Sequence, residues 1–251
     1  MFGKENHITL DDYKTFLEKL WNTNRTETEA VQKAVEYFLW SLFGLDSNVS
    51  VVDVHNDNII TSKHDPSRFY LLRGIEAKKE SLTKKRMTEK TREDIKSRYE
   101  TAQNEFAKRK NMYMGGDDND SFYSGPPDLM VVKNYNYENI EHGNGTICFL
   151  VETKEFEEDL KKIQKNDSKF SQIFSHMTQA NNVVLTNGKM WILYTQKSND
   201  HPNYDEWKQE VLQNPKVFEL WNDKNEKNTE KFEELCETIK KLVVNTNKVT
   251  C

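Results

Sequence analysis

The sequence lacks long apolar runs and is poor in cysteine. No stretch approaches the roughly 20 apolar residues that a membrane-spanning helix needs, and the N-terminal MFGKENHITLDDYK is too polar for a signal peptide. The three cysteines, at 148, 236 and 251, show no CxxC spacing, which disfavours a structural zinc site and favours a reducing compartment. We therefore expect an intracellular protein with no membrane partner, cytoplasmic or, if its source is eukaryotic, nuclear.

Sequence motifs of several common activities are also missing. The chain contains no GxxxxGK[ST] phosphate loop, and its six histidines do not form an HExxH or similar ligand spacing. It also has no internal repeat. These absences disfavour ATP-driven translocation, a histidine-based metal site and a repeat fold.

Aromatic and charged residues, in contrast, are plentiful. The chain has 13 Phe, 10 Tyr and 5 Trp, enough for a real core, and its 31% of charged residues requires a large solvated surface. A length of 251 residues suits one large domain or one domain with an elaboration. We therefore expect residues 1–251 to form a single domain.

A basic segment interrupts an otherwise acidic chain. The net charge is −5, yet residues 78–110 hold 12 Lys or Arg against 6 Asp or Glu, so this segment carries +6 and the remainder −11. Such asymmetry suggests a local surface that faces phosphate. The candidate phosphate contacts are Lys84, Lys85, Arg86, Lys108, Arg109 and Lys110. The alternatives are a solvated helix with internal ion pairs and a dimerisation arm that would make the protein a homodimer.

Apolar periodicity predicts two helices at the start of the chain, in ITLDDYKTFLEKLW (8–21) and in TEAVQKAVEYFLWSLFG (28–44). Thr9 and Asp12 resemble a capping box, and Gly44 is a natural helix stop. Strands are predicted at 50–56, 58–62 and 68–74. Residues 75–113 have a charged helical pattern, as one helix or a hairpin, and 75–120 is interpreted as a charged helical insertion with its loop.

The pattern after this loop indicates an α/β fold. Strands are predicted at 128–135 and 146–152, a helical region with a break near Asn166 at 157–180, and strands at 182–186 and 190–196 joined by an Asn187-Gly188 turn. Residues 205–251 are predicted to be a mostly helical C-terminal extension. This order of strands and helices implies a mixed central β-sheet flanked by helices.

Three charged residues stand at the ends of two of these strands. Asp128 precedes the apolar run of PPDLMVV, and Glu152 and Lys154 end CFLVETK. Glu152 and Lys154 are two residues apart, so along a strand their side chains share one face. If the two strands pair, all three residues converge at one edge of the sheet. The alternative is structural: a turn residue at 128 and an exposed ion pair at 152 and 154.

The chemistry of these residues suits a metal site for phosphodiester cleavage. Two carboxylates can hold Mg²⁺ while leaving positions for water and a phosphate oxygen, and the backbone carbonyl of Thr153 can add another oxygen. The metal would polarise phosphorus and acidify a bound water. Lys154 would orient that water or offset charge developing on the phosphate. Glu152 directly follows ICFLV, and a carboxylate so near a core needs a reason to be there.

These motifs resemble the PD-(D/E)xK nuclease signature. The stretch FSQIFSHMTQANNVVLTNGKMWILY resembles the region after the catalytic lysine in the N-terminal nuclease domain of type I restriction enzyme R subunits. Gln172 matches a glutamine of that family, and His176 stands where the family usually has an aromatic residue. ETEAVQKAVEYFLWSLFG resembles the family's first helix, which begins with a Glu that we align with Glu29, Glu27 being the competitor. The resemblance covers about 25–45 and 125–195.

The resemblance implies a restriction-endonuclease-like core and a metal-dependent endonuclease. Such an enzyme would use Mg²⁺, with Mn²⁺ able to substitute, to hydrolyse phosphodiester bonds in nucleic acid, DNA being favoured over RNA, in restriction or host defence. The implied catalytic residues are Asp128, Glu152, Lys154, Glu29 and Gln172, and the implied metal ligands are Asp128, Glu152 and Thr153. The alternative is a catalytically silent module on the same fold that binds nucleic acid or protein.

Overall fold

The computed structural model describes residues 8–23, 27–44, 48–53, 93, 127–134, 146–177, 180–197 and 204–245. The strands predicted at 58–62 and 68–74 lie outside this part of the chain. So does the charged segment 75–120 apart from residue 93, and with it all six candidate phosphate contacts.

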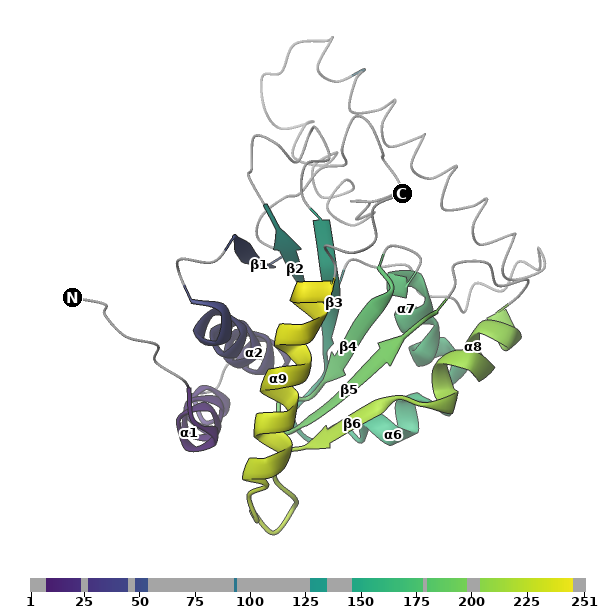
Figure 1. Cartoon of the computed structure of the whole chain (residues 1–251). Coiled ribbons are helices and arrows are strands. Elements are labelled where there is room, and N and C mark those ends of the chain that lie inside the picture. The colour runs from purple at the N-terminus through teal and green to yellow at the C-terminus, as the bar shows by residue number, and fades with distance from the viewer. Residues whose placement is uncertain are drawn as a thin grey trace.

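A six-stranded mixed sheet forms the centre of the fold (Figure 1). Its strands follow one another in chain order: β1 (Val49–Asp53), β2 (Leu129–Lys133), β3 (Thr146–Thr153), β4 (Asn182–Thr186), β5 (Met190–Thr195) and β6 (Lys216–Glu219). β3 and β4 are parallel, and every other neighbouring pair is antiparallel. A parallel pair needs a crossover connection, and the helical segment between β3 and β4 provides it.

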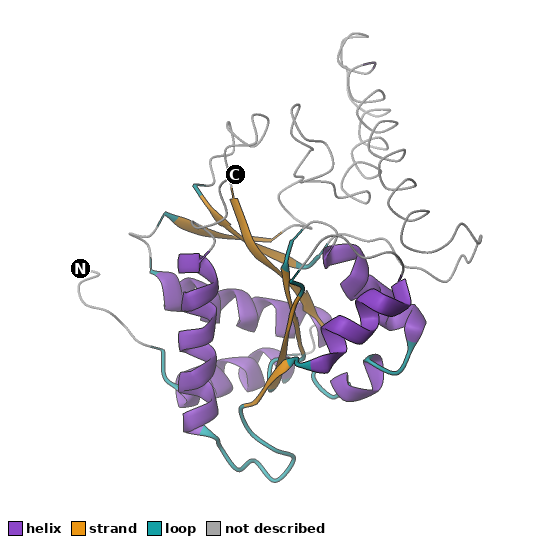
Figure 2. Cartoon of the chain, turned by 45° about the vertical axis from the view of Figure 1, so that its right-hand side comes forward, coloured by secondary structure: helices purple, strands orange, loops and turns teal. Residues whose placement is uncertain are grey.

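Helices cover both faces of the sheet (Figure 2). α1 (Leu10–Trp21), α2 (Glu27–Phe43) and α9 (Thr229–Asn245) pack on one face, whereas α6 (Leu160–Ile163), α7 (Asp167–Met177) and α8 (Tyr204–Gln213) pack on the other. The predicted α/β class, with a mixed sheet flanked by helices, is therefore confirmed.

Two separate apolar cores explain why the central strands are apolar on both faces. Val131 and Val151 belong to the core shared with α1, α2 and α9, whereas Met130 and Leu150 belong to the core shared with α6, α7 and α8. Because successive side chains of a strand point to opposite faces, a strand buried on both sides has no polar alternation. All five residues of β2 are buried accordingly.

The predicted signals at helix ends are confirmed. Asp12 N–H donates to Thr9 Oγ1 at 3.1 Å, and the Asp12 carboxylate accepts from Thr9 N–H at 3.3 Å, which completes the capping box. The hydrogen bonds from Thr9 lower the pKa of Asp12. Gly44 follows α2 with φ of 71°. The break between α6 and α7 falls where Asn166 Oδ1 accepts from Lys169 N–H at 3.2 Å, so Asn166 caps α7.

β6 was not predicted from the sequence, which favoured helix after residue 205. This strand is short, and only Phe218 of its four residues is buried, so its sequence shows little apolar alternation. β6 nevertheless pairs with β5, and α9 places Phe232, Leu235 and Ile239 in the core of the first face. Within the predicted extension 205–251, β6 therefore belongs to the sheet and α9 belongs to the helical layer on its first face.

The turn between β4 and β5 differs by one residue from the prediction. Asn187 N–H donates to the Met190 carbonyl at 3.3 Å, and Asn187 Oδ1 accepts from Met190 N–H at 2.8 Å. The two central residues are therefore Gly188 and Lys189, with Gly188 in the first position at φ of 88°. A hairpin with glycine first and positive φ is the other favoured two-residue geometry.

Replacement of Gly188 is expected to destabilise the protein. A Cβ at this position would lie 2.6 Å from Leu17 Cδ2, and the φ of 88° strains any L side chain. Gly188→Ala should lower the free energy of unfolding by about 2–4 kcal/mol, from backbone strain and overpacking together. Gly44→Ala is the matched control, because its φ is 71° but no atom of the described residues lies within 4 Å of the added Cβ. Urea unfolding measures both variants, and equal losses would contradict the steric argument.

Candidate metal centre at the ends of β2 and β3

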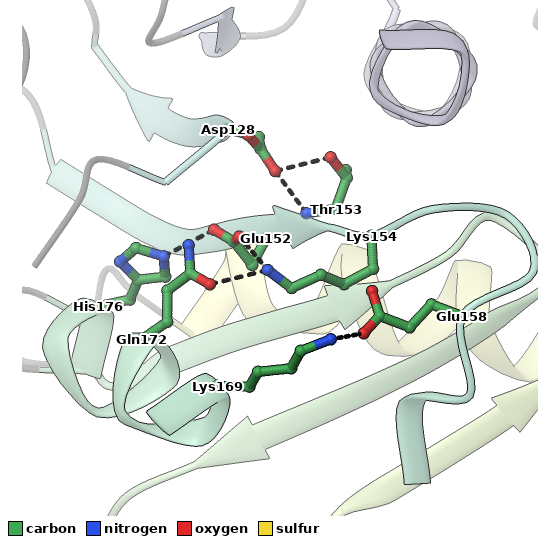
Figure 3. Close-up of polar contacts among 8 residues, drawn as sticks. All are labelled: Asp128, Glu152, Thr153, Lys154, Glu158, Lys169, Gln172 and His176. Carbon is green, nitrogen blue, oxygen red and sulfur yellow. Dashed lines mark hydrogen bonds and ion pairs between the residues drawn. The ribbon is translucent and has the colours of Figure 1, made fainter. Parts of the chain in front are cut away.

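The antiparallel pairing of β2 and β3 brings the three signature residues to one end of the sheet (Figure 3). Leu129 pairs with Val151. Asp128 precedes Leu129 and Glu152 follows Val151, so in an antiparallel pair both residues come next to this position at the same end of the ladder. Asp128 N–H donates to the Val151 carbonyl at 3.0 Å, which extends the ladder by one bond. The pairing on which the site hypothesis depended is therefore present.

Asp128 is buried and held by Thr153. Its side chain lies at the start of β2 with 7% of the residue exposed. Asp128 Oδ2 accepts from both the backbone N–H and the hydroxyl of Thr153, each at 2.6 Å. Its backbone carbonyl accepts from Gln32 Nε2 of α2 at 3.5 Å. Short hydrogen bonds to a carboxylate are among the stronger ones in proteins, so the orientation of Asp128 is fixed.

Glu152 is the centre of a polar cluster that also contains Lys154, Gln172 and His176; we call these four residues the Glu152 cluster. Glu152 and His176 are buried, and Lys154 and Gln172 are half-buried. Glu152 is 3% exposed, and its Oε1 accepts from Lys154 Nζ at 2.7 Å. Its Oε2 lies 2.9 Å from His176 Nε2. Lys154 Nζ also donates to Gln172 Oε1 at 2.8 Å. The cluster therefore joins the end of β3 to α7, as Figure 3 shows.

Local structure explains how these side chains meet. Lys154 directly follows β3, and its N–H donates to the Thr186 carbonyl at 2.8 Å, so the β3–β4 ladder continues past the last strand residue. On α7, residues 169, 172 and 176 are spaced by three and four, which places them on one helix face. In Figure 3 this face looks toward the strand ends, and Lys169 pairs with Glu158 beside the cluster.

Glu29 occupies a different environment. Its side chain is 47% exposed and pairs with Lys33, one turn further along α2, at 2.8 Å. On α2, Gln32 contacts Asp128. The backbone of Glu27 begins α2, but its side chain lies outside the described residues. The role that the resemblance implies for Glu29 stays a prediction.

Sequence reasoning did not assign His176 or Gln32 to the site. His176 is fully buried and contacts Glu152 directly. Its spacing of four residues from Gln172 was the available signal, because residues four apart share a helix face. Gln32 lies three residues after Glu29 on α2, so the same rule relates these two positions.

The carboxylates suit a hard cation. Mg²⁺ takes oxygen ligands, keeps several waters and is commonly bound through one or two carboxylates together with substrate phosphates, and Asp128 and Glu152 supply that donor type. Across the described ranges, no group of three or more His, Cys, Asp or Glu side chains is arranged to hold a metal ion. Water and substrate oxygens would therefore complete the ligand set, and a bound cation would compete with Lys154 for Glu152 Oε1.

Comparisons with known proteins give no match to this chain. No family model, no curated protein and no solved structure is similar enough to count as one. Among the described helices, none combines the length and apolarity needed to cross a membrane.

The hydroxyl of Thr153 is expected to stabilise the fold through Asp128. Thr153→Val keeps the shape and the backbone donor but removes the hydroxyl donor to Asp128 Oδ2. The free energy of unfolding should fall by about 1.5–3 kcal/mol, the range for a hydrogen bond to a charged group. The control is Thr195→Val on β5, whose hydroxyl donates to Asn182 Oδ1 at an exposed site. Urea unfolding compares the two variants, and a loss at Thr153 no larger than at Thr195 would refute this assignment.

Proposed function

We propose that this protein is a Mg²⁺-dependent endonuclease of the PD-(D/E)xK type with a restriction-endonuclease-like core. The observation that carries the proposal is the burial of Glu152, whose carboxylate bonds to Lys154 at the end of β3. Asp128 precedes Leu129, which pairs with Val151, the residue before Glu152. Burying charged groups costs free energy unless they are paired. A fold that needed only an apolar strand end would not place an acid, a lysine and a histidine there.

Each residue has a role in phosphodiester hydrolysis under this proposal. Asp128 and Glu152 hold Mg²⁺, which when bound supplies Lewis-acid polarisation of the phosphate and a more acidic water. Lys154 orients the attacking water or offsets the negative charge that develops on the phosphate. Gln172 accepts from Lys154 Nζ and so fixes the position of the ammonium group.

The substrate that this chemistry favours is nucleic acid. The preference for DNA and a role in restriction or host defence come from the resemblance to restriction subunits. The basic segment 78–110, with its charge of +6, offers contacts to the phosphate backbone. The same segment is the candidate for a dimerisation arm.

One observation favours a second candidate, a catalytically silent binding module. Both carboxylate oxygens of Glu152 already have partners, Lys154 and His176, and Asp128 Oδ2 accepts two hydrogen bonds from Thr153. A closed network of this kind is what a site that has lost its metal would retain.

A cleavage assay separates the two functions. Plasmid, single-stranded DNA and RNA are each incubated with the protein in Mg²⁺, Mn²⁺ or EDTA. The endonuclease proposal predicts cleavage of DNA in Mg²⁺ or Mn²⁺ and none in EDTA. Binding of the same substrates in a mobility shift, with no cleavage in any metal, would favour the binding module and overturn the proposal.

A further inference from the structure

His176 contacts the Glu152 carboxylate from the side opposite the lysine. Its Nε2 lies 2.9 Å from Glu152 Oε2, whereas Lys154 Nζ lies 2.7 Å from Glu152 Oε1. The His176 side chain is 0% exposed and that of Glu152 is 5% exposed, so water does not compete for this contact. The two partners together fix the plane of the carboxylate (Figure 3).

The direction of this hydrogen bond follows from its acceptor. An ionised carboxylate only accepts hydrogen bonds, so with Glu152 ionised the contact requires the hydrogen on His176 Nε2. The other ring nitrogen, Nδ1, is buried and has no hydrogen-bond partner within the part of the chain that the structure describes. Burying a polar atom without a hydrogen-bond partner costs free energy. A leucine would fill about the same space and would bury no such atom. The imidazole is therefore not explained by packing.

We infer that His176 is a positioning residue that orients Glu152 for metal binding. This inference rests on the proposed function, because it names what holds one of the two proposed ligands. Two hydrogen bonds leave the carboxylate one orientation, and when a cation displaces Lys154 from Oε1, the bond from His176 to Oε2 keeps the carboxylate in place. Groups that orient metal ligands in this way typically contribute about 10- to 100-fold in metal affinity.

A matched pair of variants tests the inference. His176→Gln can place an amide N–H close to the position of Nε2, whereas His176→Met has similar length and no donor. Mg²⁺ binding by calorimetry should stay within a few-fold of wild type in the Gln variant and weaken about 10- to 100-fold in the Met variant. Thermal unfolding, measured in parallel, identifies which variants are folded.

The possible results distinguish the inference from the proposed function. If wild type binds Mg²⁺ and cleaves DNA but the Gln and Met variants have equal Mg²⁺ affinity, the positioning role is wrong and the nuclease stands. If wild type binds no divalent cation, both fail. Should the variants not fold, ¹⁵N NMR of the wild-type histidine ring decides: an Nε2–H that is hydrogen-bonded supports the inference, and a ring with its hydrogen on Nδ1 alone overturns it.

Discussion

Lys154→Ala is expected to lower the rate of DNA cleavage by about 100- to 1000-fold, the cost of removing one group that stabilises developing charge. Lys154 Nζ donates to Glu152 Oε1 at 2.7 Å and to Gln172 Oε1 at 2.8 Å, so its position is fixed. The substitution removes the group that acts on water or phosphate but leaves both carboxylates. Affinity for Mg²⁺ should therefore be unchanged or higher, since the ammonium no longer competes for Oε1.

The control for Lys154→Ala is the same substitution at a lysine away from the site. Lys162 on α6 is suitable because its side chain is 82% exposed and pairs only at 3.5 Å with Asp159. Lys162→Ala should cleave at close to the wild-type rate. Equal cleavage rates for Lys154→Ala and wild type would rule out the proposed role of the lysine. Loss of Mg²⁺ binding in Lys154→Ala would also rule it out, because the lysine would then act only by supporting Glu152.

Glu152→Gln is expected to abolish cleavage by removing a metal ligand. The substitution keeps the size of the side chain but removes the charge that attracts the cation, and it replaces one of the two acceptor oxygens with an NH₂ donor. Affinity for Mg²⁺ should fall by at least about 100-fold, since groups that merely orient ligands already contribute about 10- to 100-fold. Stability should also fall, because Lys154, whose side chain is 17% exposed, loses its ion-pair partner.

The matched control for this variant is Glu157→Gln. Glu157 lies in the loop after β3 and is exposed, so its replacement should leave Mg²⁺ affinity and unfolding unchanged. Calorimetry measures the Mg²⁺ affinity of both variants, and thermal unfolding measures their stability. Retained Mg²⁺ affinity in Glu152→Gln would show that the buried glutamate is a structural acid and not a ligand.

Local signals in the sequence were sufficient for most of the described fold. Thr9 with Asp12 marked the start of α1, and the apolar runs of β2 and β3 marked buried strands, because each of these patterns depends only on neighbouring residues. β6 was missed because its position depends on pairing with β5 and not on its own sequence. The turn after β4 was displaced by one residue because the register of β4 against β5 pairs Asn187 with Met190 and leaves Gly188 and Lys189 as the central residues.

The candidate site was only partly predictable for a related reason. Glu152 and Lys154 are two residues apart on one segment, so their meeting follows from strand geometry. The contact between Glu152 and His176 joins residues 24 apart and depends on how α7 packs on the sheet. The hydrogen bond from Thr153 to Asp128 likewise forms only when β2 and β3 pair in this register. Sequence spacing on one element indicates which residues share a face, but not which residue of another element they contact.

Calorimetric titration of Mg²⁺ into wild type and Asp128→Ala tests the central claim most directly. The claim is that two buried carboxylates, brought together by the pairing of β2 and β3, hold one metal ion. We predict that wild type binds Mg²⁺ and that Asp128→Ala, confirmed as folded by thermal unfolding, does not. Equal binding by both proteins, or no binding by wild type, would contradict the claim.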